Sequence, residues 1–354
     1  MQTDFLIVGG GAIGLASAQA LLQAGYRVTL VERGMVGQEA SWAGGGILSP
    51  LCSWDYQEPV TRLAHRGMGM FGDAATLLHE TTGIDPEYQR SGMLLLPPYQ
   101  TERAAKWCTQ PQVALQTVEL ADHIHGPGGA GLLLPEVAQV RNPRLMRALR
   151  KHVEMLGGVI LEQHEVLRFE IVGDRVEALQ TTQGKLDAES YIVAAGAWSN
   201  VLLGEYALGM DIRPIRGQIL LFKFDAPPFP NILLKQDLYL IPRRDGHVLV
   251  GSTLEDAGFD KSITMTARDD LLGRVREIFP DWRDRQPIQH WAGFRPGSPD
   301  NIPTIGRHPH LSNLYANSGH FRYGVTMSFA SAELLRNEIE GRPQTIPLEA
   351  YRWR

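Results

Sequence analysis

The chain has 354 residues, of which 44% are hydrophobic and 21% charged, so it can bury a large core and form two domains. A formal net charge of −5, without any Lys/Arg block, argues against nucleic acid or an anionic membrane surface as a partner. Cys52 and Cys108 are too few for a disulfide framework and have no close metal-ligating neighbours. No apolar run approaches the ~18 residues of a membrane span, so we expect a cytoplasmic protein.

The first predicted element is a strand at residues 5–8, an unbroken apolar run typical of a central parallel strand. Gly9, Gly11 and Gly14 follow it with the spacing Gly-x-Gly-x-x-Gly. In this pattern the first glycine permits a tight turn, the second lets the backbone approach a pyrophosphate, and the third lets the next helix lie close to the strand. We predict that helix at residues 12–24, with the positive end of its dipole facing the phosphates.

An acidic residue completes this N-terminal pattern. Gly25 ends the predicted helix, residues 27–31 form a second strand, and Glu32 falls at the end of that strand. A carboxylate there accepts hydrogen bonds from the ribose hydroxyls of an adenosine and would repel a 2′-phosphate. The order of strand, glycines, helix, strand and acid indicates a dinucleotide-binding unit, but it does not separate a flavin from a nicotinamide dinucleotide.

The next elements are predicted from residue size and periodicity. A stretch of small residues at 37–50 reads as a loop that lets the chain pass close to a flat, extended ligand. Helices are predicted at residues 59–79 and 143–156, and a hairpin at residues 166–183. A further apolar strand, beginning at Tyr191, runs into small residues.

The second half of the chain changes character. Strands and turns alternate from residue 216 to residue 294, which predicts an antiparallel sheet with one helix at residues 266–279. The predicted strands of this sheet are residues 218–224, 238–242, 247–252 and 289–294. The chain then returns to a strand at residues 314–317 and a closing helix at residues 325–340.

Three later motifs accompany the glycine fingerprint, in a fixed order. They are SWAGGGIL at residues 41–48, WAGFRP at 291–296 and GHFRYG at 319–324. Together they resemble the D-amino acid oxidase superfamily of FAD enzymes, and most closely its bacterial glycine oxidases, over essentially the whole chain. The resemblance implies noncovalent FAD, because residues 296–305 lack the cysteine that carries the flavin in monomeric sarcosine oxidases.

With this resemblance, the predicted fold is α/β, α+β overall. A Rossmann-like FAD-binding domain is interleaved with an antiparallel-sheet substrate domain. We assign residues 1–85, 140–205 and 296–354 to the FAD-binding domain, and residues 86–139 and 206–295 to the substrate-binding domain.

The resemblance also implies the substrate site. The arginine that holds the substrate carboxylate in the family falls on Arg295, its aromatic partner on Tyr239, and a second arginine near the substrate on Arg322. Arginine suits a zwitterionic substrate because its planar guanidinium donates two parallel hydrogen bonds to a carboxylate. Positions occupied by methionines in the glycine oxidase pattern fall on Ile47 and Leu254, which keep the pocket apolar.

A larger set of residues is expected to contact FAD. It comprises the fingerprint, the small-residue stretch, single positions on the middle strands and the C-terminal loop with the start of its helix. These residues are Gly9, Gly11, Ala12, Ile13, Gly14, Glu32, Arg33, Ala40, Ser41, Gly45, Gly46, Ile47, Val166, Gly196, His320, Phe321, Arg322, Tyr323, Gly324, Val325 and Thr326.

The chemistry expected at this site needs no side-chain acid or base. Hydride transfer from an amine carbon to flavin N5 requires an unprotonated amine and a carbon held over the ring, so Arg295 and Tyr239 act by positioning. A helix N-terminus after residues 319–324 would stabilise negative charge that develops on the flavin pyrimidine. His320 is interpreted as a contact on the flavin side rather than a base.

The function that the resemblance implies is oxidative deamination of glycine, sarcosine and small D-amino acids. The imine product would give glyoxylate or a keto acid, O2 would reoxidise the flavin to yield hydrogen peroxide, and the imine from glycine would serve the thiazole ring of thiamine. The expected partners are therefore a small amino acid or amine, O2 and further copies of this chain in a homo-oligomer.

Alternatives remain open at this point. A dehydrogenase of the same fold would oxidise D-amino acids or D-proline-like substrates and pass electrons to a quinone or another carrier. A protein of another class would bind FAD in a regulatory role without turnover. A nicotinamide dehydrogenase is a weaker third interpretation, because the stretch at 37–50 and the loop at 319–324 would have no function in such an enzyme.

Overall fold

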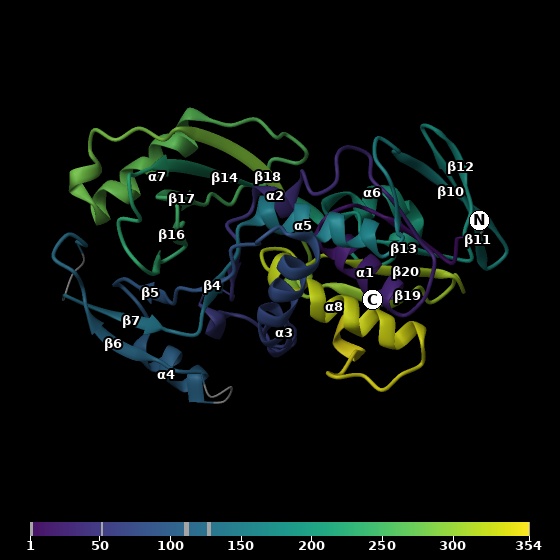
Figure 1. Ribbon diagram of the computed structural model, residues 1–354, viewed down its shortest axis with the longest axis horizontal. Coiled ribbons are helices and arrows are strands. Elements are labelled where there is room, and N and C mark those ends of the chain that lie inside the picture. Colours follow the sequence, from purple (N-terminus) through teal and green to yellow (C-terminus); the bar gives the residue numbers. More distant parts are fainter. Residues whose placement is uncertain (1–2, 51, 110–112, 126–128, 354) are drawn as a thin grey trace.

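The computed structural model describes residues 3–50, 52–109, 113–125 and 129–353. Its elements form two main sheets that lie side by side, with the eight-stranded sheet on the left of Figure 1 and the six-stranded sheet on the right. The six-stranded sheet has the order β19-β20-β13-β1-β2-β9. Its strands are β1 (Phe5–Val8), β2 (Val28–Val31), β9 (Val159–Leu161), β13 (Ser190–Val193), β19 (Thr304–Arg307) and β20 (Leu314–Ser318).

The strand β1 lies in the middle of this sheet because both of its faces are apolar. It pairs in parallel with β2 on one side and β13 on the other. Phe5 and Ile7 belong to the core shared with the helices, whereas Leu6 and Val8 belong to the core on the opposite face. Every side chain of β1 is buried. The continuous apolar run in the sequence therefore reflects burial on both faces.

Four long helices cover one face of the six-stranded sheet. They are α1 (Ala12–Gln23), α3 (Glu58–Thr82), α5 (Asn142–Met155) and α8 (Gly324–Ile339). α1 packs between α5 and α8, and α3 packs on both α5 and α8. A three-stranded sheet covers the other face through apolar side chains such as Val176 and Leu179. Its strands are β10 (Val166–Val172), β11 (Arg175–Thr181) and β12 (Gly184–Leu186).

The eight-stranded sheet has the order β18-β14-β17-β16-β15-β5-β7-β6. Its strands are β5 (Met93–Leu95), β6 (Gln116–Glu119), β7 (Ala130–Leu134), β14 (Arg213–Lys223), β15 (Ile232–Lys235), β16 (Leu238–Pro242), β17 (His247–Gly251) and β18 (Gln289–Gly297). α7 (Met265–Ile278) packs on one face of it, and α4 (Thr101–Thr109) and α6 (Ser199–Leu203) are shorter helices. The sheet is mixed rather than purely antiparallel, because β5 pairs in parallel with β15.

The structure corrects two predicted elements. The stretch at 37–50 is not a continuous loop, because it contains the helix α2 (Ala40–Ala43) and the strand β3 (Ile47–Leu48). β3 joins β4 (Gln89–Arg90) and β8 (Ala138–Gln139) in a small sheet. β18 continues three residues beyond the predicted end at Phe294, since it is an edge strand where Pro296 is tolerated. Arg295 consequently lies within a strand.

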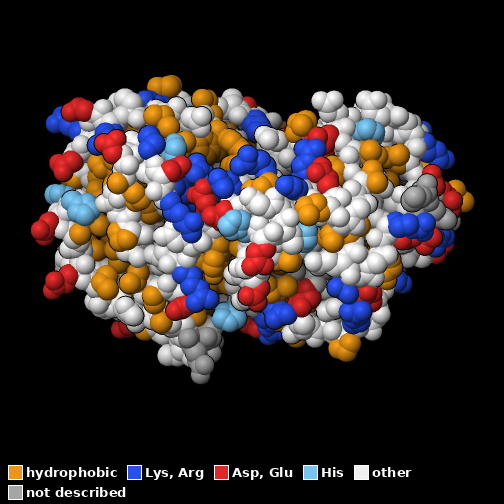
Figure 2. All heavy atoms as spheres, viewed as in Figure 1, with side chains coloured by type: hydrophobic (Ala, Val, Ile, Leu, Met, Phe, Trp, Pro, Cys, Tyr) orange, Lys and Arg blue, Asp and Glu red, His pale blue; other side chains and the backbone are white. Residues whose placement is uncertain are grey.

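Charged side chains are spread evenly over the surface, as they are along the sequence. On the face drawn in Figure 2, Lys and Arg side chains are interspersed with Asp and Glu side chains. Among the helices of the described residues, none is long and apolar enough to cross a membrane.

Candidate active site

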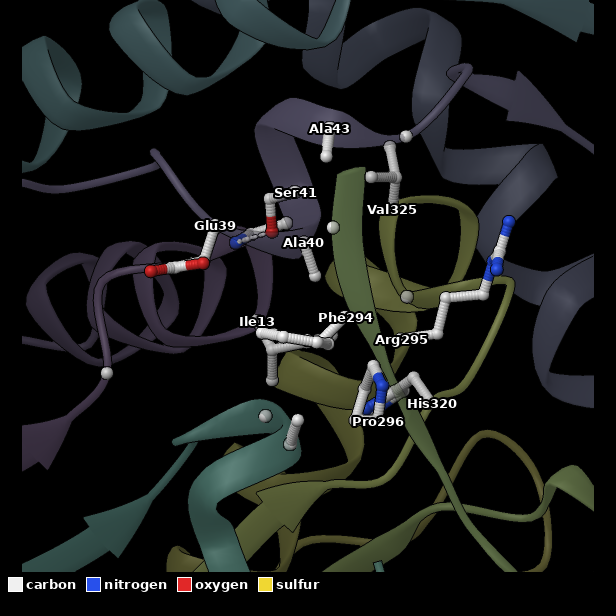
Figure 3. Close-up of a pocket in the computed structure, with 18 of the residues that line it drawn as sticks. Ile13, Glu39, Ala40, Ser41, Ala43, Phe294, Arg295, Pro296, His320 and Val325 are labelled. Atoms are coloured by element: carbon white, nitrogen blue, oxygen red, sulfur yellow. Dashed lines mark hydrogen bonds between the residues drawn. The ribbon is translucent and has the colours of Figure 1, made fainter. Parts of the chain in front are cut away.

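A cavity of about 430 Å³ lies where the carboxyl end of β1 faces the strands β14, β16 and β18. Segments far apart in the sequence line it. Figure 3 shows Ile13 at the start of α1, Ser41 and Ala43 on α2, Arg295 on β18, and His320 from the C-terminal loop. The cavity therefore joins the two sheets, and a ligand in it would contact both.

The glycine fingerprint forms one end of the cavity. Gly9 has φ +113°, and a Cβ atom there would meet the carbonyl oxygen of Ala194, so only glycine fits between β1 and the neighbouring chain. Gly11 precedes α1 and has no side chain to cap it. The N–H of Ala12 donates to Ser41 Oγ over 2.9 Å. This open helix N-terminus, lined by backbone, is suited to a pyrophosphate.

Glu32 is fixed beside the fingerprint. Its carboxylate accepts hydrogen bonds from the N–H of Gly10 over 2.7 Å and from the N–H of Gly34 over 3.0 Å. Only 9% of the residue is exposed, and it lines the cavity. Since a carboxylate offers about four acceptor positions, two remain for the hydroxyls of a ribose.

The loop before α8 forms the opposite wall. The N–H of Phe321 donates to the carbonyl of Pro296 over 3.0 Å, and Ser298 Oγ donates to the carbonyl of Gly319 over 2.6 Å, so the loop is tied to the end of β18. Tyr323, the residue that precedes α8, provides no side-chain cap. The N-terminal residues of α8 therefore present their N–H groups and the positive end of the helix dipole to the cavity.

His320 is buried in this loop, with 1% of its surface exposed. Burial lowers the pKa of its imidazole to about 3, so the ring is neutral at pH 7. Its Nε2 lies 3.1 Å from Ser331 Oγ on α8. The imidazole is thus engaged with the helix, which agrees with a supporting role beside the flavin site.

Arg295 carries an uncompensated positive charge in the cavity. Its Nη1 donates to the carbonyl of Thr253 over 3.1 Å, and its Nη2 donates to Ser252 Oγ. Within the described part of the chain, no carboxylate pairs with it. Burial, followed by the nearby charge of Arg322, lowers the pKa of Arg295, whereas Tyr239 opposes this shift. A guanidinium held by neutral acceptors is ready to bind an anionic ligand.

Tyr239 and Arg322 flank Arg295. Tyr239, on β16, is 7% exposed, and its ring fills the space against Gly251 and Gly45. Arg322 also lines the cavity, and its Nε is buried without a hydrogen-bond partner. The three substrate residues named from the sequence are therefore brought together at one end of the cavity.

Most of the expected ligand contacts line this cavity. They are Gly9, Gly11, Ala12, Ile13, Glu32, Arg33, Ala40, Ser41, Gly45, Gly46, Ile47, Val166, Gly196, Tyr239, Arg295, His320, Phe321, Arg322, Tyr323, Gly324, Val325 and Thr326. Gly14 lies beneath it, where a Cβ atom would overlap the carbonyl oxygen of Gly9, so Gly14 sets the spacing between α1 and β1.

Leu254 is the expected pocket residue that the structure does not bring to the cavity. It does not line the cavity, and 51% of it is exposed. The chain turns away after β17, and the following Glu255 forms an ion pair with Arg216 on β14. Of the two expected apolar positions, Ile47 lines the cavity and Leu254 does not.

Two residues that contact the guanidinium of Arg295 were not predicted from the sequence. Gly217, on β14 opposite Gly293, has no room for a Cβ atom because the guanidinium of Arg295 lies over it. Ser252, the residue that follows β17, accepts a hydrogen bond from the same guanidinium. A glycine inside a strand often marks the close approach of another group. The strand was predicted to begin at residue 218, so Gly217 lay outside it and this signal was not used. Ser252 carries no comparable signal in the sequence.

The donor set favours a dinucleotide rather than a metal. Among the described residues, no group of three or more His, Cys, Asp or Glu side chains could hold a metal ion. A glycine cradle, a fixed carboxylate and the N-terminus of α1 fit the adenosine and pyrophosphate of a dinucleotide at one end. At the other end, Arg295 and Arg322 fit a small carboxylic acid. The residues present therefore fit FAD.

Comparisons with known proteins agree with this geometry. Residues 4–338 match the family model described as FAD dependent oxidoreductase. The glycine oxidase of Pseudomonas aeruginosa is 42% identical over 99% of this chain and 98% of its own length. The crystal structure of glycine oxidase from Geobacillus kaustophilus has a TM-score of 0.92 at 25% identity, covering 100% of this chain and 98% of its own.

A further relative is longer. The bifunctional protein ThiO/ThiG of Synechocystis is 32% identical over 96% of this chain, which spans 52% of that protein. The match to a solved structure over the full length confirms the predicted fold class.

Proposed function

Because the chain belongs to the family of FAD-dependent oxidoreductases, we propose that it oxidises glycine and other small amines in the cavity between its two sheets. The protein is an FAD-dependent amine oxidase, and the prediction of FAD as cofactor is confirmed. Glycine as substrate is supported by the glycine oxidases to which the chain is similar.

The observation that carries the proposal is the charge of Arg295, which forms no ion pair with a carboxylate among the described residues. Its guanidinium is held by Ser252 and the carbonyl of Thr253, both neutral, so binding a carboxylate gains charge-assisted hydrogen bonds without breaking an ion pair. Tyr239 packs beside it and narrows the site. A glycine bound there would keep its amine and its reacting carbon at a fixed distance from the arginine.

The residues proposed to hold FAD follow from the geometry. Gly9, Gly11 and the start of α1 would cradle the pyrophosphate, Glu32 would accept from the ribose, and the start of α8 would face the flavin pyrimidine. FAD, when bound, supplies an acceptor for a hydride at N5.

No side chain is proposed as a general base. His320 is neutral, but its Nε2 contacts Ser331 Oγ on α8, so this nitrogen is engaged with the helix rather than with the substrate. The positive charges of Arg295 and Arg322 favour the neutral amine of a bound amino acid over its ammonium form. The protein would thus promote deprotonation through its electric field and then hold the carbon in place.

The complete reaction that we propose is glycine plus O2 plus water giving glyoxylate, ammonia and hydrogen peroxide. Sarcosine and small D-amino acids would react in the same way. The segments that we assigned to two domains, 1–85 with 140–205 and 296–354, and 86–139 with 206–295, would supply the cofactor side and the substrate side. Similarity to ThiO/ThiG supports a role of the glycine imine in making the thiazole of thiamine.

The experiment that tests the proposal is an anaerobic titration of the purified protein with glycine, following flavin absorbance near ~450 nm. We expect bleaching that air reverses, with hydrogen peroxide formed. Bleaching that air does not reverse would replace the oxidase by a dehydrogenase. If every small amine fails to bleach the flavin, a non-catalytic FAD-binding protein is the correct reading.

A further inference from the structure

The chain bulges out of the eight-stranded sheet directly after β17. Ile219 on β14 pairs with Gly251, the last residue of β17. The next pair between the two segments joins Arg216 to Glu255. Two residues of β14 therefore oppose three residues of the other segment, 252–254. An extra residue of this kind, a β-bulge, bends its strand and redirects the groups that it carries, and bulges are frequent next to active sites.

The bulge presents two neutral acceptors to the guanidinium of Arg295. The carbonyl of Thr253 accepts from Nη1 over 3.1 Å, and Ser252 Oγ accepts from Nη2. The N–H of Gln218 on β14 donates to Thr253 Oγ1 over 2.9 Å. Thr253 is therefore bonded to β14 through its side chain while its carbonyl contacts Arg295.

Glu255 fixes the side chain of Thr253 from the C-terminal end of the bulge. Its Oε1 accepts from the Thr253 hydroxyl and, over 2.9 Å, from Gln218 Nε2, and its Oε2 accepts from Arg216 Nη2 over 2.7 Å. Its backbone exchanges two hydrogen bonds of 2.9 Å with that of Arg216. Both carboxylate oxygens are thus held by donors from β14 and from the bulge.

The Glu255 carboxylate is ionised at pH 7. Burial acts to raise its pKa, but hydrogen bonds from Thr253, Arg216 and Gln218 lower it. An ionised carboxylate only accepts hydrogen bonds, so the Thr253 hydroxyl donates to it and remains able to accept from the N–H of Gln218. The hydroxyl is therefore fixed in direction by a partner on each side.

We propose that Thr253 and Glu255 are positioning residues for the carboxylate of the substrate. Their hydrogen bond holds the bulge in the form that directs the Thr253 carbonyl and the Ser252 hydroxyl at Arg295. Without this bond, Arg295 would sample more orientations, and binding a carboxylate would cost more conformational entropy. This inference rests on the proposed amine oxidase function and adds two residues that act through Arg295.

Two variants remove the hydrogen bond by different means. Thr253→Val keeps the shape of the side chain without the hydroxyl, and Glu255→Gln keeps the size without the charge. In the second variant Arg216 retains its ion pair with Asp260 over 2.9 Å, so we expect this variant to fold. Thr253→Ser retains a hydroxyl and is the rescue variant. Glu277→Gln, on the exposed side of α7, controls for the loss of a paired glutamate.

Two measurements on the FAD-loaded protein compare these variants. Calorimetry gives the Kd of methoxyacetate, a carboxylate in which an ether oxygen replaces the nitrogen of sarcosine, so binding is measured without oxidation. Steady-state kinetics gives kcat and KM for glycine. We expect Thr253→Val and Glu255→Gln to raise both Kd and KM about tenfold and to change kcat less than about twofold. Thr253→Ser and Glu277→Gln should resemble the wild type, and every variant should retain FAD.

The same substitution in the Arg295→Ala background shows whether the effect passes through Arg295. At low glycine concentration, Glu255→Gln should slow anaerobic flavin bleaching about tenfold when Arg295 is present and less than about twofold when it is absent. A merely structural role of Glu255 would slow bleaching equally in both backgrounds, and that result would overturn the proposal.

The outcomes distinguish this inference from the proposed function. Wild-type Kd and KM in both Thr253→Val and Glu255→Gln would overturn the positioning role even if glycine is oxidised. If glycine does not bleach the flavin but methoxyacetate binding weakens in these two variants and recovers in Thr253→Ser, the positioning role stands and the amine oxidase function fails.

Discussion

Arg295 shows how the function depends on the surroundings of a single side chain. Most arginines at the surface of this chain pair with acidic residues, as Arg27 does with Asp4. Arg295 instead lies over Gly217 and is held by Ser252 and a carbonyl group. Neutral partners orient the guanidinium without neutralising it, so its charge remains available to a substrate carboxylate.

Replacing Arg295 by alanine should therefore remove the carboxylate contact but spare the dinucleotide end of the cavity. We expect kcat/KM for glycine to fall by roughly a hundredfold or more, with FAD retained. Steady-state kinetics together with the flavin-to-protein absorbance ratio checks this. Near-normal efficiency in the variant would remove Arg295 from the substrate site.

Gly217 provides a subtler test of the same contact. Alanine at this position would place a methyl group where the guanidinium of Arg295 lies, and the side chain would have to move. We expect KM for glycine to rise by about tenfold while FAD still binds. The control is Gly273→Ala, in an exposed part of α7 with nothing within 4 Å of the added atom. An unchanged KM in Gly217→Ala would show that the guanidinium is free to shift.

At the scale of elements, two helix N-termini converge on one cavity. α1 begins after the glycine fingerprint, and α8 begins after the loop that contains His320. Neither helix has a side-chain cap from the preceding residue, so, apart from the Ala12 N–H that donates to Ser41 Oγ, their first N–H groups are left for a ligand. The loop before α8 depends on a buried histidine that contacts Ser331 on the helix, so this element should be sensitive to acid.

The acid sensitivity follows from the pKa of His320, which burial lowers to about 3 from an ordinary value near 6.5. Below pH 6.5 the unfolded chain takes up a proton that the folded chain rejects until about pH 3. The free energy of unfolding therefore falls as the pH drops through this window. Between pH 6.5 and pH 5 the loss attributable to His320 should be about 2 kcal/mol.

Urea unfolding of the wild type and of His320→Gln, at pH 7 and pH 5 with a fixed excess of FAD, measures this contribution. The variant should lose less stability between the two pH values than the wild type. His65→Gln, which replaces an exposed histidine on α3, controls for the loss of a histidine as such. Identical pH dependence in wild type and His320→Gln would contradict the assignment.

At the scale of the molecule, a buried arginine connects the eight-stranded sheet to the small sheet of β3, β4 and β8 and to the segment after α2. Arg243 follows β16 and is 4% exposed. Its Nη1 donates to Gln139 Oε1 over 2.7 Å and to the carbonyl of Val140 over 2.9 Å, and its Nη2 donates to the carbonyl of Gly45 over 2.6 Å. Burial lowers its pKa to about 10, so it is still charged at pH 7. It thereby holds the cofactor side of the cavity against the eight-stranded sheet.

Removing this connection should be costly. Arg243→Met leaves three acceptors without their donor, and we expect a loss of about 2–5 kcal/mol in unfolding free energy together with weaker FAD binding. The matched control is the neighbouring Arg244→Met, since Arg244 is exposed and its pair with Asp85 should contribute at most about 1 kcal/mol. Thermal unfolding of both variants with and without added FAD checks the difference. Equal effects would show that Arg243 has no special role.

The sequence by itself determined those features that depend on local chain geometry. The apolar run of β1, the glycines that follow it and Glu32 at the end of β2 have fixed spacings, because a strand, a turn and a helix each impose one. Arg295 and Arg322 also belong to motifs with fixed local spacing. The resemblance of these motifs to a known family indicated the cofactor. The fold class, the FAD cofactor and the enzyme class predicted in this way are confirmed.

The tertiary structure decided what depends on contacts between distant segments. Leu254 lies outside the cavity and is exposed, next to Glu255, which pairs with Arg216 on β14, and nothing in the residues around Leu254 indicates this. Gly217 and Arg295 are far apart in the chain and meet only because β14 and β18 pair in one register. Local spacing fixes which backbone conformations are possible, whereas the packing of one sheet edge against another decides which side chains share a cavity.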